Sequence, residues 1–165
     1  DKIGLITFAN KIGTVLAPDR KPIQRANILQ LLYNQTTSFL ESDFEMLYTQ
    51  IRSRIKQRSL LILFTNFESL SGLKRQLPYL RSIAKYHLLL VVFFENTELT
   101  QLSAIDASDL EEVYVKTIAE KFAFEKRMIV KELSKYGILS ILSSPEKLTA
   151  NTVNKYLELK TRQAL

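Results

Sequence analysis

The chain has 165 residues, of which 46% are hydrophobic and 24% are charged, and this is the size and composition of one globular domain with a hydrophobic core. It contains no cysteine and one histidine, which excludes disulfides, cysteine-ligated zinc, iron–sulfur clusters, thiol nucleophiles and most histidine-based catalysis. The 23 basic and 17 acidic residues give a net charge of +6, and this excess is mild and spread along the chain.

The first segment predicts a β-hairpin followed by a short helix. Two strand-like runs, Lys2 to Phe8 and Ile12 to Leu16, flank a three-residue turn and should pair antiparallel. Pro18 and Pro22 then bracket a connection. The next run, 23–33, carries apolar residues at the spacing of a helix.

A strongly amphipathic helix and a buried strand come next. Apolar residues at spacings of three and four predict a helix that starts at Ser42 and ends near Arg58. Ser42-Asp43-Phe44-Glu45 fits a capping box, in which Ser42 accepts a hydrogen bond from the third helical amide. The following run, 59–65, reads SLLILFT without polar alternation, which predicts a central parallel strand covered on both faces.

The third segment predicts another helix and another buried strand. Leu73, Leu77 and Leu80 form one stripe of a helix over 70–85, which Pro78 must kink or restart. The run HLLLVVFF over 87–94 repeats the signature of a strand that is buried on both faces. His87 starts this strand and is expected to be structural.

The last segment predicts a long helix, a strand and a final helix. Ser108-Asp109-Leu110-Glu111 is a second capping-box sequence, and the helix that it starts should end near Lys135, before a C-cap glycine at Gly137. A strand over 138–142 and a helix from Ser144-Pro145 to about residue 162 complete the chain. The long helix should turn one apolar face inward, formed by Ile118, Phe122, Ile129 and Leu133.

This order of elements predicts an α/β fold in one domain over residues 1–165. Strands that alternate with helices form a mainly parallel sheet with helices on both faces and right-handed crossovers. The hairpin adds an antiparallel edge. Ligands of such sheets bind beyond the carboxyl ends of the strands, so that edge is where a functional site is expected.

Candidate site residues therefore lie just after the strand SLLILFT and at the start of the helix before it. They are Ser42, Asp43, Thr65, Asn66 and Glu68. Hydroxyl and carboxylate oxygens at such an edge suit a hard cation such as Mg²⁺. The alternative is that Ser42 and Asp43 cap a helix and that Asn66 turns the chain. Glycine-rich phosphate-binding loops and the G-x-S-x-G elbow of serine hydrolases are absent from the sequence.

Three segments carry a resemblance to a known family. They are DKIGLITF, SLLILFTNFES, and the stretch from LPYLRSIAKYHLLLVVFFENTEL to AEKFAFEKRMIVKELSKYGILSILSSPEKLTANTVNKYLELK. The chain resembles the bacterial family called domain of unknown function fifty-eight, whose members are von Willebrand factor type A-like domains often encoded beside MoxR-type AAA+ ATPases. The resemblance implies a doubly wound Rossmann-like sheet of order 3-2-1-4-5-6 and a metal-ion-dependent adhesion site that binds a partner protein.

The resemblance also implies that the site is degenerate in this chain. The sequence starts at the family's second strand, so the first strand and its D-x-S-x-S motif are missing. Ser42 would take the position of the family's threonine, and Asn66 stands where an aspartate is expected. We therefore expect no bound cofactor, with Mg²⁺ held only by the complete domain. In a sheet of this order the missing first strand is central. Its position should be filled by a segment of another chain, or the hairpin should pair differently or pack loosely.

We interpret the chain as a non-catalytic protein-binding and assembly module whose partner is a MoxR-type ATPase or its client. One alternative is a metal-assisted hydrolase that uses Asp43 and Glu68. Another is a binder of nucleic acid or an anionic surface through the basic cluster at 52–58, which also fits the negative end of a helix dipole. We expect a cytoplasmic location, with any membrane anchor of the parent protein outside this segment, and no nucleic acid. We expect no membrane contact from the segment itself, because its longest apolar run is far shorter than the roughly 20 residues of a bilayer-spanning helix.

Overall fold

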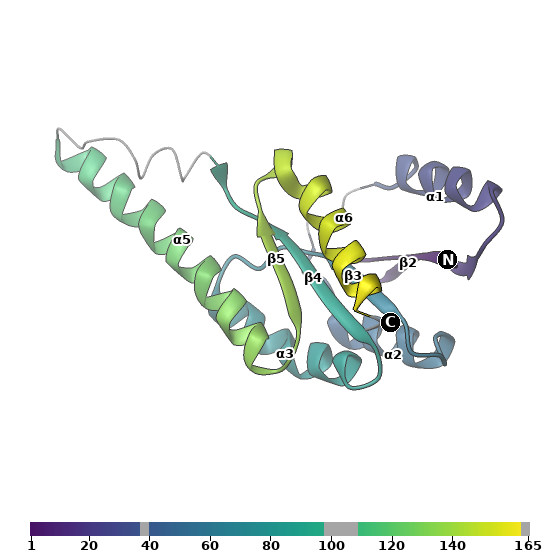
Figure 1. Cartoon of the computed structure of the whole chain (residues 1–165). Coiled ribbons are helices and arrows are strands. Elements are labelled where there is room, and N and C mark those ends of the chain that lie inside the picture. The colour runs from purple at the N-terminus through teal and green to yellow at the C-terminus, as the bar shows by residue number, and fades with distance from the viewer. Residues whose placement is uncertain (37–39, 98–108, 163–165) are drawn as a thin grey trace. The chain divides into compact units, whose positions relative to one another are not determined.

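The computed structural model describes residues 1–36, 40–97 and 109–162 (Figure 1). The chain divides into two compact units, Asp1–Arg54 and Ile55–Leu165, and each is described by itself. The prediction of a single domain stays a prediction. The second capping-box serine, Ser108, lies outside the described residues.

The first unit starts with the predicted hairpin. Strands β1 (Ile3–Phe8) and β2 (Ile12–Asp19) pair antiparallel, and their register runs from Ile3 opposite Asp19 to Phe8 opposite Ile12. The prediction that Pro18 lies in a connection is wrong, because β2 extends through it. A two-stranded ribbon has only edge strands, and an edge strand tolerates a residue that lacks an amide proton.

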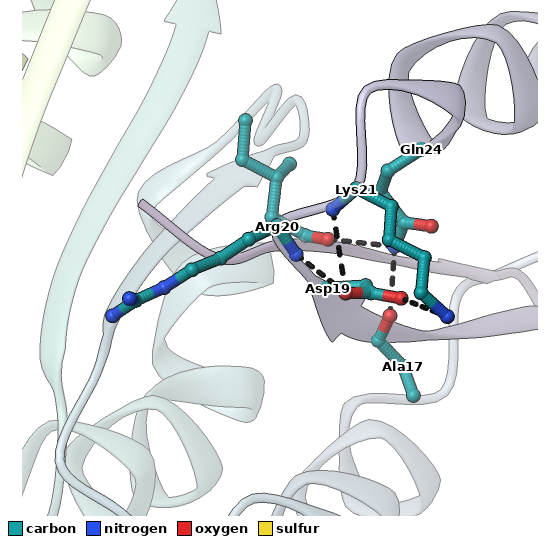
Figure 2. Close-up of polar contacts among 6 residues, drawn as sticks. Ala17, Asp19, Arg20, Lys21 and Gln24 are labelled. Carbon is teal, nitrogen blue, oxygen red and sulfur yellow. Dashed lines mark hydrogen bonds and ion pairs between the residues drawn. The ribbon is translucent and has the colours of Figure 1, made fainter.

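The helix α1 (Ile23–Tyr33) contacts the hairpin through the buried side chain of Gln24. The Gln24 side-chain amide donates to the backbone oxygens of Ile3 and Ala17, at 2.8 Å each, and so contacts both strands. Figure 2 shows this amide beside the turn in which the Asp19 carboxylate accepts from the Arg20 amide at 2.6 Å. That hydrogen bond is the main cause that lowers the pKa of Asp19. The turn between β2 and α1 is thus set by local polar contacts.

The helix α2 (Phe44–Arg54) starts one residue later than its capping-box prediction requires. Asp43, not Ser42, is the N-cap: its Oδ1 accepts from the Met46 amide at 2.8 Å, while its own amide donates to the oxygen of Ala9 at 2.8 Å. The Phe44 ring packs edge-on against Phe8, with centroids 5.3 Å apart. The helix also ends at Arg54 rather than near Arg58.

The second unit contains a three-stranded parallel sheet of order β3-β4-β5. Its strands are β3 (Leu60–Phe64), β4 (Leu88–Phe94) and β5 (Leu139–Ser143). The strand β4 lies in the middle and is almost wholly buried. The prediction that SLLILFT is a central strand is wrong for this sheet, where β3 lies at an edge. The reason is that an unbroken apolar run reports cover on both faces, and an edge strand packed between helices has such cover too.

Helices cover both faces of this sheet, as Figure 1 shows for α6 against α3 and α5. Leu148 of α6 (Pro145–Thr161) packs on the face formed by Leu90, Val92 and Ile141. Phe93 points to the opposite face because successive side chains alternate along a strand, and its ring contacts α5 (Leu110–Lys135). The helix α3 (Leu70–Ala84) packs against α5 and β4.

Local signals set the ends of these helices, with one departure from prediction along α5. The helix α3 is one helix through Pro78, so of the two predicted effects of this proline the restart does not occur and the kink stays a prediction. Gly137 has φ +69° and ends α5 in a Schellman motif, in which its amide donates to Ser134 and the next amide to Leu133. Phe122 was expected to face inward but is exposed, whereas Ile129 and Leu133 of the same helix are fully buried.

The α/β prediction is confirmed in its coarse form: helices flank a parallel sheet, and the hairpin is a separate antiparallel pair. Within the described ranges the hairpin shares no strand pairing with β3, β4 or β5. How the position of the missing first strand is filled stays a prediction. Among the helices that the structure describes, none has the length and apolar character needed to cross a bilayer.

Candidate functional site at the carboxyl edge of the parallel sheet

The three parallel strands end at one edge of the sheet, at Phe64, Phe94 and Ser143. Strand pairing continues just beyond them, because the Thr65 amide donates to the oxygen of Val92 at 3.1 Å. Between β4 and β5, the Glu95 amide donates to the oxygen of Ser143 at 3.0 Å. The backbone of this edge is therefore held by the sheet itself, and the loop after β3 starts from a fixed position.

A lysine from α5 holds the loop that follows β3. The Lys126 ammonium donates to Asn66 Oδ1 and, at 2.8 Å, to the backbone oxygen of Phe67. Lys126 is only 9% exposed, and its Nζ lies 5.7 Å from the centroid of the Phe93 ring. Burying a charge is costly unless it is paired or hydrogen-bonded, and the two loop oxygens provide those bonds.

Two opposing influences act on the pKa of Lys126. Burial disfavours the charged ammonium and lowers this pKa, while the nearby Glu68 carboxylate raises it in part. Glu68 itself is exposed at the edge. The Glu68 carboxylate thus opposes the charge of the Lys126 ammonium across the loop.

The residue next to Lys126 holds the other end of the same loop. Glu125 Oε2 accepts from the Leu70 amide at 2.8 Å, at the first turn of α3. Ser69, the N-cap, accepts from the Gly72 amide at 3.1 Å. A helix leaves its first amides without intrahelical partners. At the start of α3 these amides are capped by the adjacent Ser69 and by Glu125, which is distant in the sequence.

The Glu125→Ala variant should be less stable by about 1 kcal/mol, because the Leu70 amide loses a charged acceptor beside the positive end of the α3 dipole. Urea unfolding followed by circular dichroism measures the difference. Glu120→Ala is the matched control, since Glu120 is an exposed glutamate of the same helix. Equal losses in the two variants would show that the contact with Leu70 adds nothing.

Two aromatic side chains are exposed at the ends of neighbouring strands. Phe64 is 57% exposed and Phe94 is 39% exposed. Phe64 pairs in register with Val92, and Phe94 lies two residues beyond Val92 on the same face of the sheet. Such diagonal neighbours on adjacent strands lie roughly 7–8 Å apart, so the two rings can form one surface. We call Phe64 and Phe94 the aromatic pair.

The predicted site residues fall in both units. Thr65, Asn66 and Glu68 lie at the carboxyl edge of the parallel sheet, as predicted, directly after β3. Ser42 and Asp43 belong to the first unit, and the carboxylate of Asp43 serves there as a helix cap. That these two residues meet the edge stays a prediction.

Sequence reasoning missed Lys126, Glu125 and the aromatic pair. One signal pointed to Lys126: it occupies a position on the apolar stripe of the long helix, three residues before Ile129 and seven before Leu133. A lysine at such a position needs a buried hydrogen-bond partner. The aromatic pair carried no signal, because both phenylalanines end apolar runs that are otherwise buried.

Two oxygens of the loop at this edge are engaged by an ammonium group. In the described part of the chain, no three His, Cys, Asp or Glu residues lie close enough together to hold one. Two oxygens of the loop, Asn66 Oδ1 and the backbone oxygen of Phe67, accept from the Lys126 ammonium rather than lying open to a metal ion. A hard cation requires oxygen ligands that are free to coordinate and a site that is negative overall.

Comparisons of the chain with protein-family models, with curated proteins and with solved structures find no significant match. The geometry of the carboxyl edge is therefore the basis for the assignment of function.

Proposed function

We propose that this chain is a non-catalytic protein-binding module that engages a partner protein at the carboxyl edge of its parallel sheet. The observation that carries this proposal is the exposure of the aromatic pair, Phe64 and Phe94, at the ends of adjacent strands. Phenylalanine is normally buried, and two exposed rings on one face of a rigid sheet are a ready contact surface.

The surroundings of the aromatic pair support this proposal. Thr65, Asn66, Glu68 and Glu95 follow the two strands in the sequence and supply polar groups at the same edge of the sheet. Protein interfaces commonly have an apolar or aromatic centre within a polar rim, and buried aromatic side chains contribute much of the binding energy. The edge is also where open α/β sheets usually bind their ligands.

The finer fold assignment and the partner class come from the family resemblance. A doubly wound, von Willebrand A-like sheet is compatible with the parallel order β3-β4-β5 and with helices on both faces. The resemblance suggests a MoxR-type AAA+ ATPase, or a client of that ATPase, as the partner. A non-catalytic role fits the engagement of the Asp43 carboxylate as a helix cap.

A binding experiment with a MoxR-type AAA+ ATPase from the source organism tests the proposal. We expect the wild-type chain to bind the ATPase and the Phe64→Ala/Phe94→Ala double variant to bind it at least about tenfold more weakly, since central aromatic anchors are often worth 1–2 kcal/mol or more each. Biolayer interferometry with the immobilised chain measures the affinity.

Tyr86→Ala is the matched control. Tyr86 is 40% exposed, much like Phe94, but it lies before β4, at the opposite end of the strand from Phe94. The control should bind like the wild type. If no MoxR-type ATPase binds, the partner class is wrong. If the double variant and the control bind equally well, the aromatic pair is not the binding surface.

A further inference from the structure

We propose that the ammonium group of Lys126 takes the place of a metal ion at the carboxyl edge, by binding the loop oxygens that a metal ion would use. Partner recognition at this edge then proceeds without a divalent metal ion. That a partner binds at the carboxyl edge rests on the proposed function. The role of Lys126 rests on geometry alone, namely a buried ammonium that binds two oxygens of the loop after β3.

Both oxygens are of the kind that bind hard cations. Asn66 Oδ1 is a side-chain amide oxygen and Phe67 O is a backbone carbonyl, and each is a common ligand of divalent metal ions. Here both accept from Nζ of Lys126. A metal ion that used either oxygen would lie within a few ångströms of the ammonium, where the like charges repel and the lysine hydrogen bonds are lost.

Lys126 is held so that it cannot readily leave. It lies on the buried stripe of α5, with Ile129 on the same stripe, and its ammonium approaches the ring of Phe93. The adjacent Glu125 accepts from the Leu70 amide, which fixes this part of α5 against the start of α3. An exposed lysine could rotate into water, but this one would have to leave the interior of the second unit.

A positive charge already faces a carboxylate at this edge without a metal. The Lys126 ammonium faces the carboxylate of Glu68, which is the charged group that acts on it across the loop. At Asn66 an amide stands where the resemblance expects a carboxylate. The neutral amide accepts from the ammonium, whereas a divalent cation at the same oxygen would be repelled by that ammonium.

The first test uses the wild-type chain without any partner. Mn²⁺ is added at millimolar concentration, and NMR spectra are recorded to detect paramagnetic broadening of the backbone amides of residues 65–70. We expect no broadening of these signals beyond that of exposed amides elsewhere. Selective broadening at Asn66–Glu68 would overturn the proposal, because it would place a divalent ion on the loop.

The second test removes the charge and keeps the length of the side chain. In Lys126→Met, we expect the amides of residues 66–70 to exchange with solvent about tenfold faster or more, because the loop loses two hydrogen bonds to a charged donor. Lys121→Met, at an exposed position of the same helix, should exchange like the wild type. Unchanged exchange in Lys126→Met would overturn the role of the ammonium. If this variant does not fold, the Mn²⁺ experiment decides.

Binding of the ATPase should then be equal in Mg²⁺ and in EDTA, with nucleotide absent. Binding that requires Mg²⁺ would overturn metal-independent recognition. If no ATPase binds in either condition, the proposed function fails, but the Mn²⁺ and exchange results still decide the role of Lys126. The two failures are thus distinguishable.

Discussion

The Phe93→Ala variant is expected to lose about 3–5 kcal/mol of unfolding free energy, which is the usual cost of removing a fully buried phenylalanine ring. Phe93 is 0% exposed, on the central strand of the parallel sheet, and its ring contacts the buried end of Lys126. The alanine would leave a cavity between β4 and α5 and remove the ring beside the ammonium. Urea unfolding followed by circular dichroism measures this loss.

Phe94 provides the matched control, because it is the same residue type one position further along the strand. Its side chain is 39% exposed on the other face of the sheet, so Phe94→Ala should cost less than about 1 kcal/mol. The two variants should affect different properties. Phe93→Ala lowers the free energy of unfolding, and Phe94→Ala weakens partner binding. Similar stability losses in both variants would contradict the assignment of Phe93 to the core and Phe94 to the binding surface.

The Gln24→Ala variant should destabilise the first unit by about 2 kcal/mol. The buried Gln24 amide donates to Ile3 in β1 and to Ala17 in β2, and an alanine leaves both of these partly buried carbonyl oxygens without this donor. An isolated two-stranded hairpin is marginally stable, so the loss should be concentrated in its backbone protection. Hydrogen exchange of the amides of β1 and β2 measures it.

Gln30→Ala is the control for this variant. Gln30 belongs to the same helix and is exposed, so its replacement should leave the protection of the hairpin unchanged. Equal exchange of the hairpin amides in both variants would show that α1 is not fastened to the hairpin through Gln24. The helix has no continuous buried stripe, which is why one polar side chain has so large an expected effect.

The order and type of the elements could be predicted from local patterns. The runs LLILF and LLLVVFF are too short for buried helices and too apolar for exposed strands, so they indicate parallel strands between layers of helices. Gly137 ended the long helix where predicted, because only a residue without a Cβ adopts its left-handed conformation at little cost.

Helix starts could be predicted only to within one residue. In the Ser-Asp pair before α2, the serine fits a capping box, yet the aspartate makes the cap. Asp109 likewise caps α5 by accepting from the Glu112 amide at 2.8 Å. Serine and aspartate are both strong N-caps, so the choice between neighbours depends on where the chain enters the helix. The contact between the Asp43 amide and Ala9 fixes that entry for α2.

The sequence by itself determined the α/β class, the parallel strands and the location of Thr65, Asn66 and Glu68 at a strand end, because these follow from periodicity and from neighbours along the chain. Only the tertiary structure decided what that strand end contains. Lys126 lies 60 residues from Asn66 in the sequence, and the exposure of Phe64 and Phe94 depends on where the helices stop covering the sheet. Such contacts arise from packing between distant segments, which no local pattern encodes.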